Sequence, residues 1–143
     1  WQHVLEPLSG YLLLGSALLR PELVSRKFED GLASGYNFGP QLTSNRTVAD
    51  LVQEILKHYP GQWEDQSDPN AQHEASKLNL AIDKAFHLLE WKPVWNFETT
   101  IEKTLEWYKT AEKEGFIDFT KAQITSYVND AAQCGLTWSQ KNT

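Results

Sequence analysis

Apolar residues recur at helical spacing along most of this chain, and proline or glycine interrupts the pattern at the boundaries. The clearest case is the segment 47–59, in which the apolar positions three or four residues apart are Val48, Leu51, Val52, Ile55, Leu56 and Tyr59. Thr47 and Asp50 have the spacing of a capping box, with Asp in place of the usual Glu or Gln. The pattern predicts an amphipathic helix with one buried face.

Further helices are expected over residues 4–19, 84–89, 96–114 and 120–131. Asp83, Asn96 and Thr120 each stand where a side chain could cap the amino terminus of a helix. Gly115 is placed to end the third of these helices. The remaining tail, 134–143, has no strong periodicity, and we expect it to be loosely ordered.

Two short segments have the pattern of strands. Residues 36–38 lie between glycines and are stopped by Gly39 and Pro40, and apolar residues alternate over 78–82. Together with the helices, these segments predict a helix-rich α/β fold. The arrangement is not that of a βαβαβ nucleotide-binding fold. A division into 1–115 and a carboxy-terminal helix and tail, 116–143, is expected.

Composition excludes several classes of function. A net charge of −6 argues against an extended nucleic-acid surface, because phosphate backbones need clustered Lys and Arg. The longest apolar stretch is too short to cross a bilayer, so no membrane partner is expected. Cys134 is the single cysteine, which rules out an internal disulfide and makes a reducing cytoplasm the simplest compartment.

Several catalytic motifs are absent from the sequence. There is no glycine-rich phosphate turn of the G-x-G-x-x-G or G-x-x-x-x-G-K type, and no G-x-S-x-G nucleophile motif. The four histidines show no pair at metal-binding spacing, so no metal site is expected. His58 and His87 lie in predicted helices, where a structural role is favoured over catalysis. A self-contained nucleotide-dependent enzyme is improbable on these grounds.

Four stretches of sequence resemble a known enzyme family. They are WQHVLEPLSGYL at 1–12, YNFGP at 36–40, HEASKLNLAIDKA at 73–85 and LLEWKPVWNFETTIEKTLEWYK at 88–109. YNFGP and EWKP are similar to motifs shared by nucleotide-sugar epimerases and dehydratases of the extended short-chain dehydrogenase/reductase family. WQHVLEPLSGYL and HEA resemble the CDP-glucose 4,6-dehydratase branch. Glu90 stands where the family usually has Gly, and from Phe116 onward no resemblance is evident.

The resemblance implies a carboxy-terminal, substrate-binding portion whose Rossmann domain is absent from this chain. In that family an amino-terminal Rossmann half binds NAD, carries the catalytic residues and pairs the subunits into a homo-oligomer. We therefore assign no catalytic residue here and expect this portion alone to be inactive. The implied parent activity is dehydration of CDP-glucose to CDP-4-dehydro-6-deoxyglucose, a lyase reaction that serves dideoxy sugars of a surface polysaccharide such as the O-antigen of lipopolysaccharide.

The resemblance also implies a set of substrate-binding residues: Trp1, Gln2, His3, Asn37, His73 and Glu74. The first three would line the diphosphate end of the ligand, and the carboxamide of Asn37 could donate to a phosphate oxygen. His73 and Glu74 would lie in a loop that reaches the nucleotide, where Glu74 could accept ribose hydroxyl bonds. Arg46 and Lys77 are weaker candidates, because surface cations are usually only solvated.

Two alternatives stay open from the sequence. YNFGP and EWKP alone do not distinguish a CDP-glucose enzyme from an epimerase, decarboxylase or dehydratase that acts on another nucleotide sugar. The helical pattern is also compatible with a stand-alone, non-catalytic sugar-binding module.

Overall fold

The computed structural model describes residues 1–20, 32–68, 79–111 and 115–140. The helices in these ranges are α1 (Leu5–Leu19), α2 (Val48–His58), α3 (Asp83–Leu89), α4 (Phe97–Ala111) and α5 (Phe116–Gln133), with short 3-10 turns η2 (Leu42–Ser44) and η3 (Thr137–Ser139). The prediction of a helix-rich chain is therefore confirmed. No helix within the described ranges is both long and apolar enough to cross a membrane.

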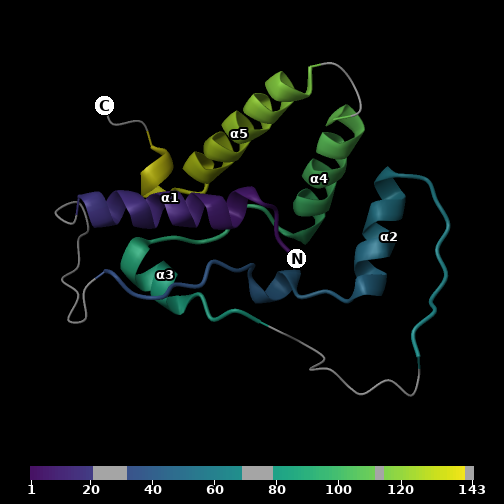
Figure 1. Cartoon of the computed structure of the whole chain (residues 1–143), viewed down its shortest axis with the longest axis horizontal. Coiled ribbons are helices and arrows are strands. Elements are labelled where there is room, and N and C mark those ends of the chain that lie inside the picture. Colours follow the sequence, from purple (N-terminus) through teal and green to yellow (C-terminus); the bar gives the residue numbers. More distant parts are fainter. Residues whose placement is uncertain (21–31, 69–78, 112–114, 141–143) are drawn as a thin grey trace.

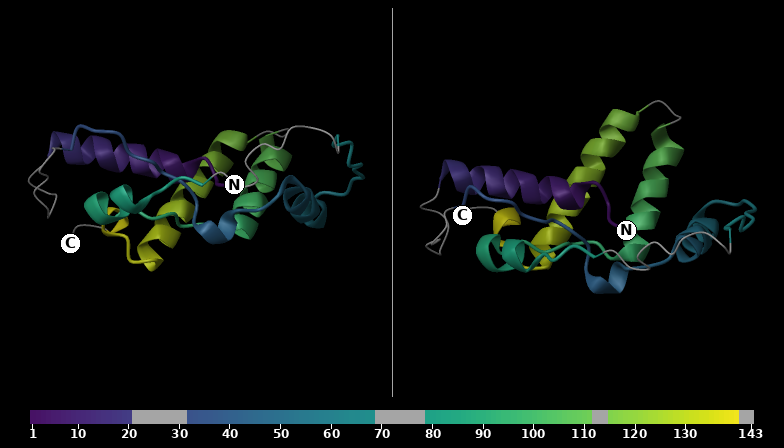
Figure 2. Two further views of the ribbon diagram at one scale, coloured as in Figure 1. Left: turned by 90° about the horizontal axis from the view of Figure 1, so that it is seen from below. Right: turned by 60° about the horizontal axis from the view of Figure 1, so that its bottom comes forward.

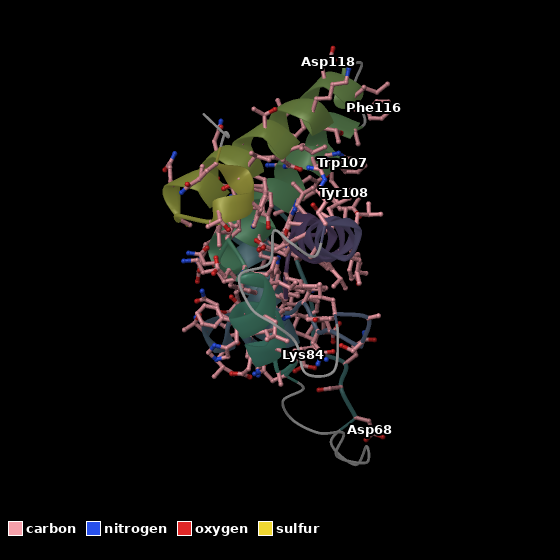
Figure 3. All side chains as sticks on the ribbon, turned by 90° about the vertical axis from the view of Figure 1, so that its left-hand side faces the viewer. Asp68, Lys84, Trp107, Tyr108, Phe116 and Asp118 are labelled. Atoms are coloured by element: carbon pink, nitrogen blue, oxygen red, sulfur yellow. The ribbon has the colours of Figure 1, made fainter. Side chains whose placement is uncertain are left out.

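Helices α4 and α5 form a hairpin that rises from one end of α1 (Figure 1). α2 packs against α4, whereas α3 packs against α1. The two turned views in Figure 2 show the same order, with α2 on the far side of α4 from α1. In Figure 3, Trp107, Tyr108, Phe116 and Asp118 mark the end of the hairpin at which α4 leads into α5, and Lys84 on α3 lies toward the opposite side of the molecule.

The main core lies between α1, α3 and the segment 36–39. Trp91 is fully buried at its centre, and the ring of Phe38 meets the indole edge to face at a centroid distance of 5.0 Å. Gly10 on α1 lies against the same Phe38 ring, where a Cβ atom would clash. A glycine at this position therefore allows α1 to approach the segment closely.

The outward side of α1 stays apolar. Leu12 and Leu19 are 76% and 85% exposed, and Val4 and Tyr11 are also mostly exposed. A helix that is apolar nearly all round is usually buried on all sides. Tyr11 contacts the ring of Phe38 edge to face at 5.5 Å, but this face of α1, which we call the α1 stripe, stays mostly exposed among the described residues.

The predicted strand at 36–38 is wrong, and so is the part of the strand 78–82 that lies within the described residues. Both segments are extended and lie side by side, but the carboxamide of Asn37, not a backbone ladder, bonds the carbonyl of Ala81 at 3.3 Å. A strand is defined by backbone pairing with a neighbour, and neither segment finds that pairing here. The described residues thus contain no strand, and the α/β class is not confirmed; Leu78 lies outside them.

Helix starts follow the predicted caps in two cases and depart from them in two. Thr47 and Asp50 form both bonds of the capping box, and the Asn96 carboxamide oxygen accepts the Thr99 N–H at 2.8 Å. Asp83, however, is the first residue of α3 and makes no cap bond. Helix α5 begins at Phe116 rather than after Thr120.

The segment after α5 is better ordered than the sequence suggests. Leu136 is only 3% exposed, and η3 packs back against α5. The expectation of a loosely ordered tail is therefore wrong for 134–140, while 141–143 lie outside the described residues. The division of the chain after residue 115 stays a prediction.

Candidate functional site

The first residues of the chain are tied to the segment 36–46. The indole N–H of Trp1 donates to the carbonyl of Arg46 at 3.1 Å, and the side-chain amide of Gln2 donates to the carbonyl of Phe38 at 3.1 Å. About half of Trp1 is exposed. The carbonyl oxygen of the Gln2 side chain is buried without a partner among the described residues.

Asn37 is exposed and precedes Phe38, the residue that Gln2 bonds. Gln2 bonds the residue next to Asn37, so the structure brings two of the candidate substrate-binding residues into adjacent segments. The Asn37 carboxamide donates one of its two N–H groups to the carbonyl of Ala81. Its oxygen and second hydrogen remain available to a ligand. We group Trp1, Gln2 and Asn37 as the candidate binding residues of this region and call them the 1–37 surface.

His3 lies behind that surface rather than on it, with only 5% of the residue exposed. Its Nδ1 accepts the backbone N–H of Leu5 at 3.2 Å, so the neutral ring carries its proton on Nε2. The ring meets Trp95 edge to face at 4.8 Å. Burial lowers the pKa of His3 to about 4, which keeps the ring neutral near pH 7.

Glu6 is fully buried and is the most heavily bonded side chain near the candidate site. Its carboxylate accepts the backbone N–H of Val94 at 3.1 and 3.0 Å, the backbone N–H of Trp95 at 2.8 Å and the hydroxyl of Tyr127 at 2.7 Å. Burial raises the pKa of Glu6, and the bonds from Trp95, Tyr127 and Val94 oppose that rise. The carboxylate thus joins α1, the 91–96 turn and α5.

Ser9 and Trp91 extend the same network. The indole N–H of Trp91 donates to the Ser9 hydroxyl at 2.9 Å, and that hydroxyl lies 3.1 Å from the Tyr127 oxygen. Burial, and then the nearby charge of Glu6, raise the pKa of Tyr127, so its hydroxyl stays protonated. A protonated phenol can donate to Glu6 at any physiological pH.

Helix α5 also holds the 91–96 turn through Asp130. The indole N–H of Trp95 donates to the Asp130 carboxylate at 2.8 Å, and the Trp95 ring packs edge to face on Tyr127 at 5.0 Å. The turn is entered through Glu90, whose φ of 54° lies in the left-handed region. That conformation favours glycine, which agrees with the Gly usual at this position in the resembling family.

Sequence reasoning missed Glu6, Tyr127 and Asp130 as parts of the site. The signal available for Glu6 was its isolation, since it is the single charged residue between positions 4 and 19. Tyr127 lies in the helix predicted over 120–131, whose periodicity gave it no role beyond packing. His73, Glu74 and Lys77 lie outside the described residues. The guanidinium of Arg46 lies over the ring of Phe97 at 5.7 Å.

Two other features bear on ligand binding. Within the described ranges, no three His, Cys, Asp or Glu side chains are grouped so as to hold a metal ion. A groove of about 850 Å³ runs between α1, α3, α5 and η3, and its lining is mixed, with leucines, Tyr127 and Trp138 beside polar residues such as Arg20, His87 and Glu90. None of Trp1, Gln2, His3 and Asn37, the candidate binding residues that the structure describes, lines this groove, so its size does not support the 1–37 surface.

Sequence comparison relates the chain to the nucleotide-sugar dehydratases. It is 32% identical over 135 residues to the CDP-glucose 4,6-dehydratase of Salmonella typhimurium, strain LT2. The alignment covers 90% of this chain and 34% of that enzyme, so the chain spans about a third of its relative's length. No family model matches the chain. The resemblance seen in the sequence motifs is thereby confirmed. The share of the enzyme that the alignment covers is consistent with a match to its carboxy-terminal portion.

The comparison also extends the resemblance. Residues 116–143 are about a fifth of the chain, so an alignment that covers 90% of it includes part of them. The similarity therefore extends beyond Phe116, where the sequence motifs alone showed no resemblance.

Proposed function

We propose that this chain is the nucleotide-sugar-binding portion of a CDP-glucose 4,6-dehydratase, whose product is CDP-4-dehydro-6-deoxyglucose. The observation that carries the proposal is the 32% identity to a CDP-glucose 4,6-dehydratase along 90% of the chain. The exposed α1 stripe supports it, because an apolar helix face of this kind is suited to packing against further protein.

Within this portion, the 1–37 surface would bind the diphosphate end of the substrate. Asn37 offers a free amide hydrogen to a phosphate oxygen, and the exposed ring of Trp1 offers an apolar face to a sugar or base. The net charge of −6 does not oppose a small phosphorylated ligand, since a few placed donors suffice.

The cofactor of the proposed reaction, NAD, does not fit the residues of this chain. A dinucleotide site needs a glycine-rich turn between a strand and a helix, and the sequence has no such turn. NAD and the catalytic residues would therefore belong to another part of the parent enzyme. Homo-oligomerisation through that part and a cytoplasmic location are further predictions of the same proposal.

The experiment is turnover by the full-length protein with CDP-glucose, UDP-glucose, GDP-glucose and dTDP-glucose in parallel. The 4-keto product is measured by its absorbance in alkali. We expect preferential turnover of CDP-glucose. Preference for another nucleotide would instead favour a related epimerase or dehydratase, and binding without turnover of any of the four would favour a non-catalytic module.

A variant pair tests the surface itself. Asn37→Ala should raise the KM for CDP-glucose about tenfold to a hundredfold, because it removes one hydrogen bond to a charged phosphate oxygen. Asn129→Ala removes the same carboxamide from an exposed position on α5 and should leave KM unchanged. An unchanged KM in Asn37→Ala would remove that residue from the site.

A further inference from the structure

Helix α5 holds the 91–96 turn from two directions. The Tyr127 hydroxyl bonds the Glu6 carboxylate at 2.7 Å, and the Asp130 carboxylate accepts the Trp95 indole N–H at 2.8 Å. The rings of Tyr127 and Trp95 pack edge to face between these two bonds. The position of Trp95 is therefore set by α5.

The same turn holds the first residues of the chain. The Trp95 ring packs against the buried His3 ring at 4.8 Å, and the backbone N–H of Glu6 donates to the carbonyl of His3 at 3.0 Å. Gln2 is the next residue along the chain and bonds the carbonyl of Phe38. A shift of Trp95 or Glu6 would thus move His3 and, with it, the 1–37 surface.

We propose that α5 positions the 1–37 surface for substrate, with Glu6, Tyr127 and Asp130 as positioning residues that do not touch the ligand. The inference rests on the proposed function of that surface. Glu6 and Tyr127 are 0% and 3% exposed, and although Tyr127 borders the groove between α1, α3, α5 and η3, no residue of the 1–37 surface lines that groove. Glu6 and Tyr127 therefore do not contact a ligand on the 1–37 surface. Their contacts run inward, from α5 through the turn to His3.

The test compares two variants of the full-length protein that lose the same atom. Tyr127→Phe removes the hydroxyl that bonds Glu6 and keeps the ring. Tyr108→Phe is the matched control, since Tyr108 is 62% exposed on α4. We expect Tyr127→Phe to raise the KM for CDP-glucose about fivefold, with kcat within about twofold, because one buried hydrogen bond contributes about 1 kcal/mol. Tyr108→Phe should change neither constant.

A second readout does not need the substrate. The His3 imidazole is titrated by NMR, with its signal assigned through a His3→Gln variant. In the wild type the pKa should lie near 4, and loosening of Trp95 should move it toward 6.5. Asp130→Ala should produce this rise, whereas Asp130→Asn keeps an oxygen acceptor for the indole and should restore the lower value.

The two readouts separate the inference from the proposed function. If the protein does not turn over CDP-glucose but Asp130→Ala raises the pKa of His3, the proposed function is wrong and the positioning by α5 stands. If Tyr127→Phe and Asp130→Ala lower the unfolding midpoint while KM and the pKa of His3 stay unchanged, α5 is merely structural and the inference is overturned. Should Tyr127→Phe fail to fold, the Asp130 pair decides.

Discussion

Replacing Glu6 by Ala should be among the most damaging single changes in α1. The carboxylate is fully buried and serves three donors, the N–H groups of Val94 and Trp95 and the hydroxyl of Tyr127. Each buried donor left without a partner costs about 1–3 kcal/mol. The cost of burying a charge, which is removed at the same time, offsets part of this sum. We expect a net loss of about 3 kcal/mol from the free energy of unfolding, a large share of the stability of a typical domain.

Glu6→Gln is the matched comparison, because it keeps the shape and one carbonyl oxygen. An amide oxygen at the Oε1 position can still accept the N–H of Trp95 and, at 3.1 Å, that of Val94. The Tyr127 hydroxyl can turn to accept from the new amide, so the main loss is the charge of the acceptor. The loss should be about 1 kcal/mol. Urea titrations followed by tryptophan fluorescence measure both variants. A loss below about 1 kcal/mol in Glu6→Ala, or a larger loss in Glu6→Gln than in Glu6→Ala, would refute the reasoning.

The same side chain predicts a pH dependence. Burial raises the folded-state pKa of Glu6 above 4.5, so the folded state binds its proton more tightly than the unfolded state does. The stabilisation by protonated Glu6 is complete below 4.5 and is lost as pH rises through the raised pKa. Urea midpoints at a series of pH values should show this decline in the wild type and not in Glu6→Gln.

Three further changes can be read from the structure. His3 has a folded-state pKa of about 4 against 6.5 when unfolded, so the stability that the neutral ring contributes is complete above pH 6.5 and is lost as pH falls toward 4. Urea midpoints of the wild type should therefore fall over this pH range, and the midpoints of His3→Gln should not show that fall. Gly10→Ala should lower the free energy of unfolding by about 1–3 kcal/mol, because its Cβ would clash with Phe38. Gly15 faces open space in the same helix, so Gly15→Ala should raise it by about 0.5–1 kcal/mol. Thermal unfolding compares the two variants, and equal effects would contradict the packing of Gly10 on Phe38. Glu90→Gly should raise the melting temperature by relieving a left-handed backbone worth about 1 kcal/mol, and an unchanged or lower value would count against strain at the turn.

The features that the sequence predicted correctly are those fixed by neighbours along the chain. The helix at Val48–His58 and its capping box depend on residues within one turn of each other, so periodicity and a Thr–Asp spacing sufficed. The segment 36–38 failed as a strand because its outcome depends on a pairing partner remote in sequence. Leu136 was missed for the same kind of reason, since its burial comes from α5 folding beside it.

The candidate site also has residues that the sequence could indicate and residues that depend on contacts remote in sequence. Trp1, Gln2 and Asn37 were reached through motif resemblance, and the structure places Gln2 beside the segment that carries Asn37. The Glu6 network was out of reach, because nothing local to Glu6 indicates that its partners are Trp95 and Tyr127. A lone carboxylate in an apolar helix signals a buried partner without naming it.

The span of the Glu6 network has a consequence for biosynthesis. Glu6 and Tyr127 are separated by 121 positions, so the carboxylate leaves the ribosome long before its phenol partner has been made. At about 5–20 residues per second, that interval is roughly 6–24 seconds. During it, α1 emerges with its leucines exposed and its carboxylate solvated by water, and exposed apolar surface of this kind is prone to aggregate. The closing of α5 over the turn is thus a late event, and a ribosome stalled before the codon for Tyr127 would display a nascent chain that cannot yet complete this network.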